Sequence, residues 1–274
     1  MSLIETAMAR ARGNAAAAGA SRNAAQSGQP RREPKQRSDS AQSVVRQYPR
    51  CATDDAAMER SCILPQVADR SALRAYKILR TRLLQRMTAN QWHALAVTGA
   101  DSHQGKTVTA TNLAIALAQD PNTSVFLIDL DLQRPRIAEY MGLNCAKGLG
   151  DYLLGEASIE DIIYCPGIDR LAVIPNTRSF EHSSDLLSGA RMAELVLRLN
   201  SEVPRRIVIY DMPPLLLSDD VLTFAPNTDG VLMVVSEGAT ARGQLEKSKE
   251  LLAEMNLIGV VLNRSMERND GAYY

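Results

Sequence analysis

The sequence predicts an α/β domain in which helices cover both faces of a doubly wound, mostly parallel β-sheet. Several short apolar runs rich in Val, Ile and Leu lack polar alternation, which is typical of strands buried on both faces. Helical patterns lie between these runs, as in repeated βα units. A polar loop follows the first run directly, at the position where open α/β sheets bind ligands. The expected strands are residues 94–98, 124–128, 171–174, 207–210, 231–235 and 258–262.

Four segments carry the helical spacing of apolar residues. In the first, Leu73, Tyr76, Leu79, Leu83 and Met87 recur at spacings of three and four, and Arg and Lys fill the other face. The second segment follows the polar loop and contains the apolar run LAIALA. The expected helices are residues 71–87, 107–119, 183–200 and 239–256.

The N-terminal part of the chain has a different composition. Residues 1–69 are rich in Ala, Ser, Gln, Arg and Pro and contain few large apolar side chains, so we expect this segment to be largely disordered. Its start is an exception, because Ser2 and Glu5 form a capping-box pattern before a short amphipathic helix. That helix either frays or docks on a partner. The expected division is therefore this segment, a folded domain at 70–265 and a flexible tail at 266–274.

Composition excludes several functional classes. The 274 residues include 31 basic and 31 acidic side chains, and this zero net charge argues against nucleic-acid binding. The cysteines have no C-x-x-C spacing, as expected for reduced thiols of a cytoplasmic protein rather than a disulfide framework or zinc site. No apolar run reaches the roughly 18 residues of a transmembrane helix, so membrane association would need a partner or a surface helix. The cysteines are Cys51, Cys62, Cys145 and Cys165.

Residues 99–107, GADSHQGKT, match a phosphate-binding loop. The pattern is a Walker A motif with Ala100 in place of the first glycine, and it lies between an expected strand and an expected helix. In such a loop backbone N–H groups hold phosphate oxygens, Lys106 reaches the β- and γ-phosphates, and the Thr107 hydroxyl binds Mg²⁺. The expected nucleotide contacts in this segment are Ala100, Asp101, Ser102, His103, Gln104, Gly105, Lys106, Thr107 and Val108.

Carboxylates follow two further expected strands. Asp129 and Asp131 follow the second strand, and Asp211 comes directly after the fourth. In a parallel sheet these strand ends share one edge with the phosphate-binding loop. Carboxylate oxygens suit a hard cation that also binds phosphates, and a carboxylate there can take a proton from an attacking hydroxyl. The agreement of three strand ends favours one site over separate turn or helix caps.

The segments ADSHQGKT, LIDLDLQRP and IVIYDMPP resemble the Walker A, A′ and B motifs of bacterial tyrosine kinases (BY-kinases) from capsular and exopolysaccharide loci. The resemblance covers about residues 67–274, and the opening MSLIE is similar to members linked to exosortase-type systems. It implies a MinD/ParA-like P-loop NTPase fold that uses ATP and Mg²⁺. It also implies catalytic roles for Lys106, Asp129, Asp131 and Asp211, and metal binding by Thr107, Asp129 and Asp211.

The same resemblance places Asn263 and Arg264 where related ATPases contact the adenine region. BY-kinases autophosphorylate a C-terminal tyrosine cluster, usually on a neighbouring subunit, and this chain ends in Tyr273 and Tyr274. The implied partners are further copies of the chain, a membrane activator of the chain-length-determinant type and a cognate tyrosine phosphatase. The implied location is the cytoplasm, with recruitment to the inner face of the cell membrane.

The chain departs from the BY-kinase pattern at four points. His103 replaces a loop glycine, so the loop is strained or reshaped if that position needs a positive φ. Gln133 stands where the family has an arginine, with Arg134 next to it. The helix motif Glu-x-x-Arg-x-x-Arg is replaced by basic residues, and the tyrosine cluster is short. The basic residues of that helix are Arg74, Lys77 and Arg80.

Two other functions remain open at this stage. A MinD/ParA-like switch ATPase would have its signature lysine at the position of Asp101, which argues against that class. A degenerate nucleotide-binding scaffold that regulates polysaccharide export would explain the departures. Tyrosine autokinase activity is the function that the motifs favour.

Overall fold

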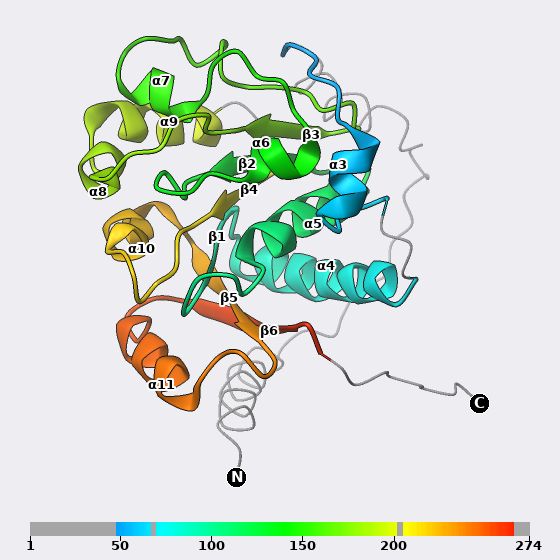
Figure 1. Ribbon diagram of the computed structural model, residues 1–274, viewed down its shortest axis with the longest axis vertical. Helices are drawn as coiled ribbons and strands as arrows, with labels where there is room; N and C mark the ends of the chain where they lie inside the picture. Colours follow the sequence, from blue (N-terminus) through cyan, green and yellow to red (C-terminus); the bar gives the residue numbers. More distant parts are fainter. Residues whose placement is uncertain (1–47, 67–69, 202–204, 266–274) are drawn as a thin grey trace, which may run out of the picture. The chain divides into compact units, whose positions relative to one another are not determined.

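The computed structural model describes residues 48–66, 70–201 and 205–265, and it contains a six-stranded, fully parallel β-sheet (Figure 1). The strand order is β3-β2-β4-β1-β5-β6, so β1 lies in the interior between β4 and β5. The chain first adds β2, β3 and β4 on one side of β1 and then adds β5 and β6 on the other side, as expected for a doubly wound sheet. The strands are β1 Ala94–Gly99, β2 Ser124–Asp129, β3 Leu171–Ile174, β4 Arg206–Asp211, β5 Gly230–Ser236 and β6 Leu257–Asn263.

All six predicted strands are confirmed. Every residue of β1, β2, β3 and β5 is buried, which explains why their sequences show no polar alternation. The edge strand β6 is different, because Leu257, Val260 and Leu262 are exposed.

Helices cover both faces of the sheet, as the sequence predicted (Figure 1). One buried apolar cluster joins the sheet to α3, α4, α5 and α6. A second joins the opposite face to α7, α8, α9 and α10, with Leu245 of α11 packed at its side. The helices are α3 Asp55–Arg60, α4 Arg70–Asn90, α5 Lys106–Ala118, α6 Ile137–Met141, α7 Leu149–Leu153, α8 Ser183–Leu187, α9 Ala190–Ser201, α10 Asp220–Phe224 and α11 Arg242–Leu251, with a 3₁₀ turn at Ala225–Asn227.

The predicted helix at 183–200 is two helices. It breaks at Ser188 and Gly189, between α8 and α9. The Ser188 hydroxyl donates to the carbonyls of Ser184 and Asp185, and glycine is a poor helix former. The break lets α8 contact α10 while α9 packs near α7.

The expectation of disorder up to residue 69 is wrong for residues 48–66. Met58, Ile63 and Leu64 are buried against the α4 and α5 side of the domain, and Asp54 caps α3. The side chain of Asn112 in α5 accepts from the Leu64 backbone amide (2.7 Å). The predicted helix at the chain start lies outside the described residues, as do Tyr273 and Tyr274.

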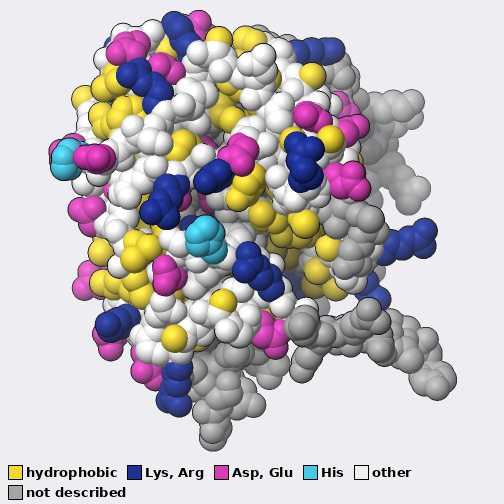
Figure 2. All heavy atoms as spheres, viewed as in Figure 1, with side chains coloured by type: hydrophobic (Ala, Val, Ile, Leu, Met, Phe, Trp, Pro, Cys, Tyr) yellow, Lys and Arg dark blue, Asp and Glu magenta, His cyan; other side chains and the backbone are white. Residues whose placement is uncertain are grey.

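Charge is distributed without a dominant sign. Lys and Arg side chains alternate with Asp and Glu over the face shown in Figure 2, in line with the zero net charge. Within 48–66, 70–201 and 205–265, no helix combines the length and hydrophobicity that a bilayer crossing requires.

Candidate nucleotide-binding site

The phosphate-binding loop connects the interior strand β1 to α5. The helix begins at Lys106, and Gly105 before it adopts φ 85°. Gly99 at the end of β1 has no room for a side chain, because a Cβ there would lie 2.5 Å from Gln104 Oε1 and 2.8 Å from the Val234 carbonyl. Because α5 begins directly after the loop, the free N–H groups of its first turn lie at the loop, and this is the arrangement that binds phosphate oxygens.

His103 does occupy a position of positive φ. Its φ is 59°, in the left-handed region where a non-glycine residue is strained. Position 103 therefore needs the positive φ that glycine adopts readily, and histidine adopts it at an energetic cost. This is the strained form of the loop that the sequence analysis considered.

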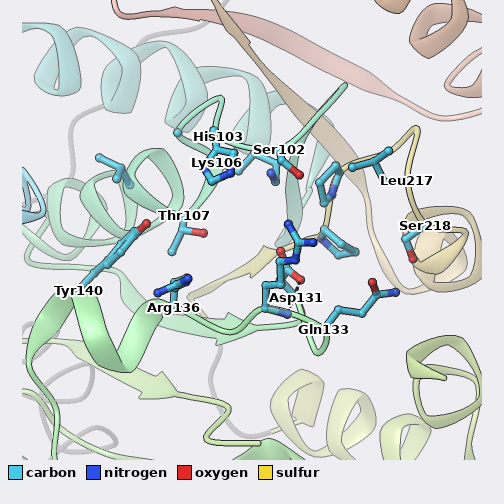
Figure 3. Close-up of a pocket in the computed structure, with 15 residues that line it drawn as sticks. Ser102, His103, Lys106, Thr107, Asp131, Gln133, Arg136, Tyr140, Leu217 and Ser218 are labelled. Atoms are coloured by element: carbon cyan, nitrogen blue, oxygen red, sulfur yellow. Dashed lines mark hydrogen bonds between the residues drawn. The ribbon is translucent and has the colours of Figure 1, made fainter. Parts of the chain in front are cut away.

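A pocket of about 550 Å³ opens beside the loop (Figure 3). Three segments line it: the loop itself, the chain that follows β2, and the chain that follows β4. Figure 3 shows Thr107 between Arg136 and Tyr140 on one side and Leu217 and Ser218 on the other. The lining residues are Ser102, His103, Gly105, Lys106, Thr107, Val108, Asp131, Gln133, Arg134, Arg136, Tyr140, Pro213, Pro214, Leu217 and Ser218.

The parallel sheet brings the predicted carboxylates to one edge. Asp129 and Asp211 are directly opposite each other in the β2–β4 register, and both are fully buried. Asp129 Oδ2 accepts from the backbone amides of Arg136 and Ile137, both at 3.0 Å, which holds the start of α6. Asp131 reaches the pocket, and its Oδ1 accepts from the Arg134 amide (3.0 Å).

Several of these carboxylate oxygens have no hydrogen-bond donor. Asp129 Oδ1 and both oxygens of Asp211 are buried and unpartnered. The Thr107 side chain lowers the pKa of Asp211 without a hydrogen bond of normal geometry to it. Buried carboxylates normally find a proton, a donor or a cation. These oxygens, with the Thr107 hydroxyl, therefore fit a hard divalent cation that keeps phosphate and water ligands.

Burial dominates the electrostatics of the site. It raises the pKa of Asp211 to about 7, where Asp131 adds to the rise and Thr107 and Lys106 oppose it. Burial also raises the pKa values of Asp129 and Asp131. It lowers the pKa of Lys106, while Asp211, Asp131 and Asp101 act in the opposite direction. The edge thus holds acidic groups whose ionised forms are only partly compensated by Lys106 and the backbone amides, so further positive charge would stabilise them.

Other predicted residues lie away from the pocket. Asn263 does not line it, and its side chain instead donates to the Gln104 carbonyl (3.0 Å). Arg264, with φ 58°, also lies outside the lining. Ala100 is buried, and the side chains of Asp101 and Gln104 point toward α11. Val108 offers an aliphatic side chain to the pocket.

Sequence reasoning missed several of the residues that line the pocket. Arg136 is the N-cap of α6 and Tyr140 lies near the end of this short helix, and their i, i+4 spacing after the second strand would have predicted a shared face. Burial raises the pKa of Tyr140, with Arg136 opposing the rise. Leu217 and Ser218 follow Asp211 by a few residues, but the sequence carries no signal that their loop turns back toward the pocket.

Comparison with protein families places residues 95–273 in the CobQ/CobB/MinD/ParA nucleotide binding domain. The tyrosine-protein kinase YwqD of Bacillus subtilis (strain 168) is 30% identical over 203 residues, covering 73% of this chain and 84% of YwqD. The tyrosine-protein kinase CpsD of Streptococcus agalactiae is 30% identical over 176 residues, which cover 63% of this chain and 75% of CpsD. The tyrosine-protein kinase etk of Escherichia coli is longer, and the chain spans 28% of it at 30% identity.

Solved structures give the same grouping. The kinase domain of the Escherichia coli tyrosine kinase ETK is similar with a TM-score of 0.65 at 27% identity, over 77% of this chain and 83% of that chain. The cell division ATPase MinD of Pyrococcus furiosus, at 24% identity and a TM-score of 0.53, shares the fold. This chain belongs to the bacterial tyrosine-protein kinases, within the CobQ/CobB/MinD/ParA class of nucleotide-binding domains.

Proposed function

We propose that this protein is an ATP-dependent tyrosine autokinase that regulates exopolysaccharide synthesis or export. The observation that carries the proposal is the meeting of Asp129 and Asp211, with unpartnered buried oxygens, beside Lys106 and Thr107 at one sheet edge. This edge combines phosphate-binding amides with carboxylates, which phosphoryl transfer to a hydroxyl requires. Membership of the tyrosine-protein kinases supports tyrosine as the acceptor.

The resting position of Lys106 suggests how the loop accepts ATP. Its Nζ donates to the Asp101 carbonyl (3.3 Å), a contact that the β- and γ-phosphates would replace. The N–H groups at the start of α5 then hold the phosphate oxygens. Thr107, Asp129 and Asp211 would hold Mg²⁺, which neutralises charge on the phosphate oxygens when bound.

The acceptor tyrosine enters from the open side of the pocket. Asp131 is the carboxylate that lines the pocket, and Asp129 lies behind it. We assign these two the task of taking the phenolic proton, for which their raised pKa values suit them. Little covalent chemistry falls to the protein, so positioning and charge neutralisation determine the rate.

The acceptors we propose are Tyr273 and Tyr274 of a neighbouring copy, which requires a homo-oligomer. We further propose a separate membrane activator of the chain-length-determinant type, a cognate tyrosine phosphatase, and a cytoplasmic location at the membrane. The resemblance to BY-kinases supports these partners.

An anti-phosphotyrosine blot of the purified full chain with Mg-ATP tests the proposal. The signal should disappear in Lys106→Met and after deletion of Tyr273 and Tyr274, and it should rise with the activator's cytoplasmic tail. ATP hydrolysis without phosphotyrosine would indicate a switch ATPase instead. Correctly folded protein that neither hydrolyses ATP nor becomes phosphorylated would indicate a regulatory scaffold.

A further inference from the structure

Two side chains of the phosphate-binding loop point away from the pocket. Asp101 and Gln104 are absent from the pocket lining. Asp101 contacts Gln244 in the first turn of α11, and Gln104 contacts Thr240 in the segment that joins β5 to α11. Gln104 is 2% exposed, so its polar atoms depend on protein partners. These two residues belong to the part of the loop where glycines are expected, and the phosphate-binding roles do not account for them.

Asp101 is fixed by α11. Its Oδ2 accepts from Gln244 Nε2 (2.7 Å), and its Oδ1 accepts from the Ser102 amide (2.6 Å). Gln244 is itself held, because its Oε1 accepts from the Ala241 amide (3.0 Å) at the start of the helix. The Asp101 carbonyl, which receives Lys106, is oriented by the same set of contacts.

Gln104 forms a second connection. Its Nε2 donates to Thr240 Oγ1 (2.8 Å), and its Oε1 accepts from the Asp101 amide (3.2 Å). Thr240 Oγ1 also accepts from the amide of Ser236, the last residue of β5 (3.0 Å). The loop is therefore tied to two successive points of the β5–α11 segment.

We propose that Gln244 and Thr240 are positioning residues for the phosphate-binding loop. The loop has a single glycine between Ala100 and Lys106, and His103 is strained in it, so its shape needs support from outside. Gln244 of α11 supplies that support through Asp101, and Thr240, just before α11, supplies it through Gln104. They set the direction of the backbone N–H groups and the resting place of Lys106, although neither touches the pocket.

The coupling works in both directions. Ser248 is the one buried residue of α11, so the helix is held to the domain by few apolar contacts. Nucleotide that orders the loop should then also order the start of α11, and displacement of α11 should weaken nucleotide binding by the same factor.

The test measures binding of a fluorescent ADP analogue with Mg²⁺ to the full chain. Gln244→Ala and Thr240→Val should weaken binding about three- to tenfold, the usual effect of losing one or two hydrogen bonds. Gln104→Leu should do the same. The matched control is Arg242→Ala, whose side chain on the same helix is 80% exposed in an ion pair with Glu246.

Hydrogen exchange of residues 100–105 in ligand-free protein gives a readout that does not need nucleotide. Exchange should be faster in Gln244→Ala than in Arg242→Ala. The inference rests on the proposed function only in that this loop binds nucleotide. Failure of wild type to bind would overturn the proposed function, and exchange would then decide the inference. Wild-type binding with unchanged affinity and exchange in Gln244→Ala and Thr240→Val would overturn the inference alone.

Discussion

The side-chain amide of Asn263, at the end of β6, donates to the backbone carbonyl of Gln104 in the phosphate-binding loop, with 3.0 Å between the two atoms. The same Nδ2 lies 2.1 Å from the place that a Cβ on Gly105 would occupy. Gly105 is thus required twice, once by its φ of 85° and once by the closeness of Asn263.

Gly105→Ala should therefore destabilise the protein by about 2 kcal/mol or more, from left-handed strain and the clash together. The double variant Gly105→Ala/Asn263→Ala should remove the clash and regain the stability lost to it, but the backbone strain at residue 105 should remain. Asn263→Ala alone should cost about 1 kcal/mol for its hydrogen bond. Urea unfolding of the three variants measures the coupling. Strictly additive losses would show that the two residues do not meet.

Replacing His103 should reveal the strain in the loop. His103→Gly should equal or exceed wild type in stability, because relief of the left-handed strain offsets the greater chain entropy of glycine. His103→Val should lose about 1–2 kcal/mol, since a β-branched residue is worst at positive φ. The control is the same two substitutions, to glycine and to valine, at Ser102, whose φ is not positive. An identical ranking of glycine and valine at both positions would contradict this account.

The sequence allowed the strands and the shared carboxylate edge to be predicted for a physical reason. Fully buried parallel strands need continuous apolar runs, and parallel strands end at one edge, so Asp129 and Asp211 had to meet. Side-chain direction within a loop has no such periodic signal. The contacts of the Asp101 and Gln104 side chains with Gln244 and Thr240 were therefore not predicted, while the expected nucleotide contacts of these two residues stay a prediction. Residues 48–66 were missed because their few apolar side chains are scattered among polar ones.

The hydroxyl of Ser183 should contribute to the stability of the protein, because it donates to the buried carboxylate of Asp220. Its hydroxyl donates to Asp220 Oδ2 (2.6 Å) and accepts from Gln133 Nε2 (3.3 Å), and Asp220 Oδ1 is buried without a donor. Ser183→Ala should cost about 1–3 kcal/mol, because it removes a donor from a buried carboxylate. Ser184→Ala is the neighbouring control, with a smaller expected effect. Equal unfolding free energies for the two alanine variants would refute the prediction.

The thiols of Cys51 and Cys145 should be convertible to a disulfide. Their sulfurs lie 3.7 Å apart and connect the segment before α3 to the chain after α6. Diamide treatment should remove two hydrogens from the protein mass and link peptides that are distant in sequence. Burial raises the pKa of Cys145 to about 12, so the reaction should be faster near about pH 9 than near neutrality. Cys51→Ser should abolish the product. Absence of the link in wild type would contradict the packing of residues 48–66.

Asp211 should make the ligand-free protein less stable as pH rises. Its pKa is raised from 3.8 to about 7, so the unfolded chain ionises this carboxyl at lower pH than the folded protein does. Its contribution to stability is complete below about pH 4 and is lost as pH rises through about 7. Asp211→Asn keeps the side chain neutral and lets its amide donate toward Asp129, so it should raise Tm by several degrees at about pH 8 while removing kinase activity.

The gain from Asp211→Asn should shrink at about pH 5, where the wild-type carboxyl is largely protonated. The measurement is the Tm difference between Asp211→Asn and wild type at the two pH values, with EDTA present to keep the protein free of metal. Asp161→Asn is the matched control, because the Ser158 amide lowers the pKa of this exposed carboxyl and reverses the sign. A Tm difference for Asp211→Asn that is the same at both pH values would show that ionisation of Asp211 is not what destabilises the site. A gain confined to the higher pH would mean that this residue is retained for its chemistry at the expense of stability.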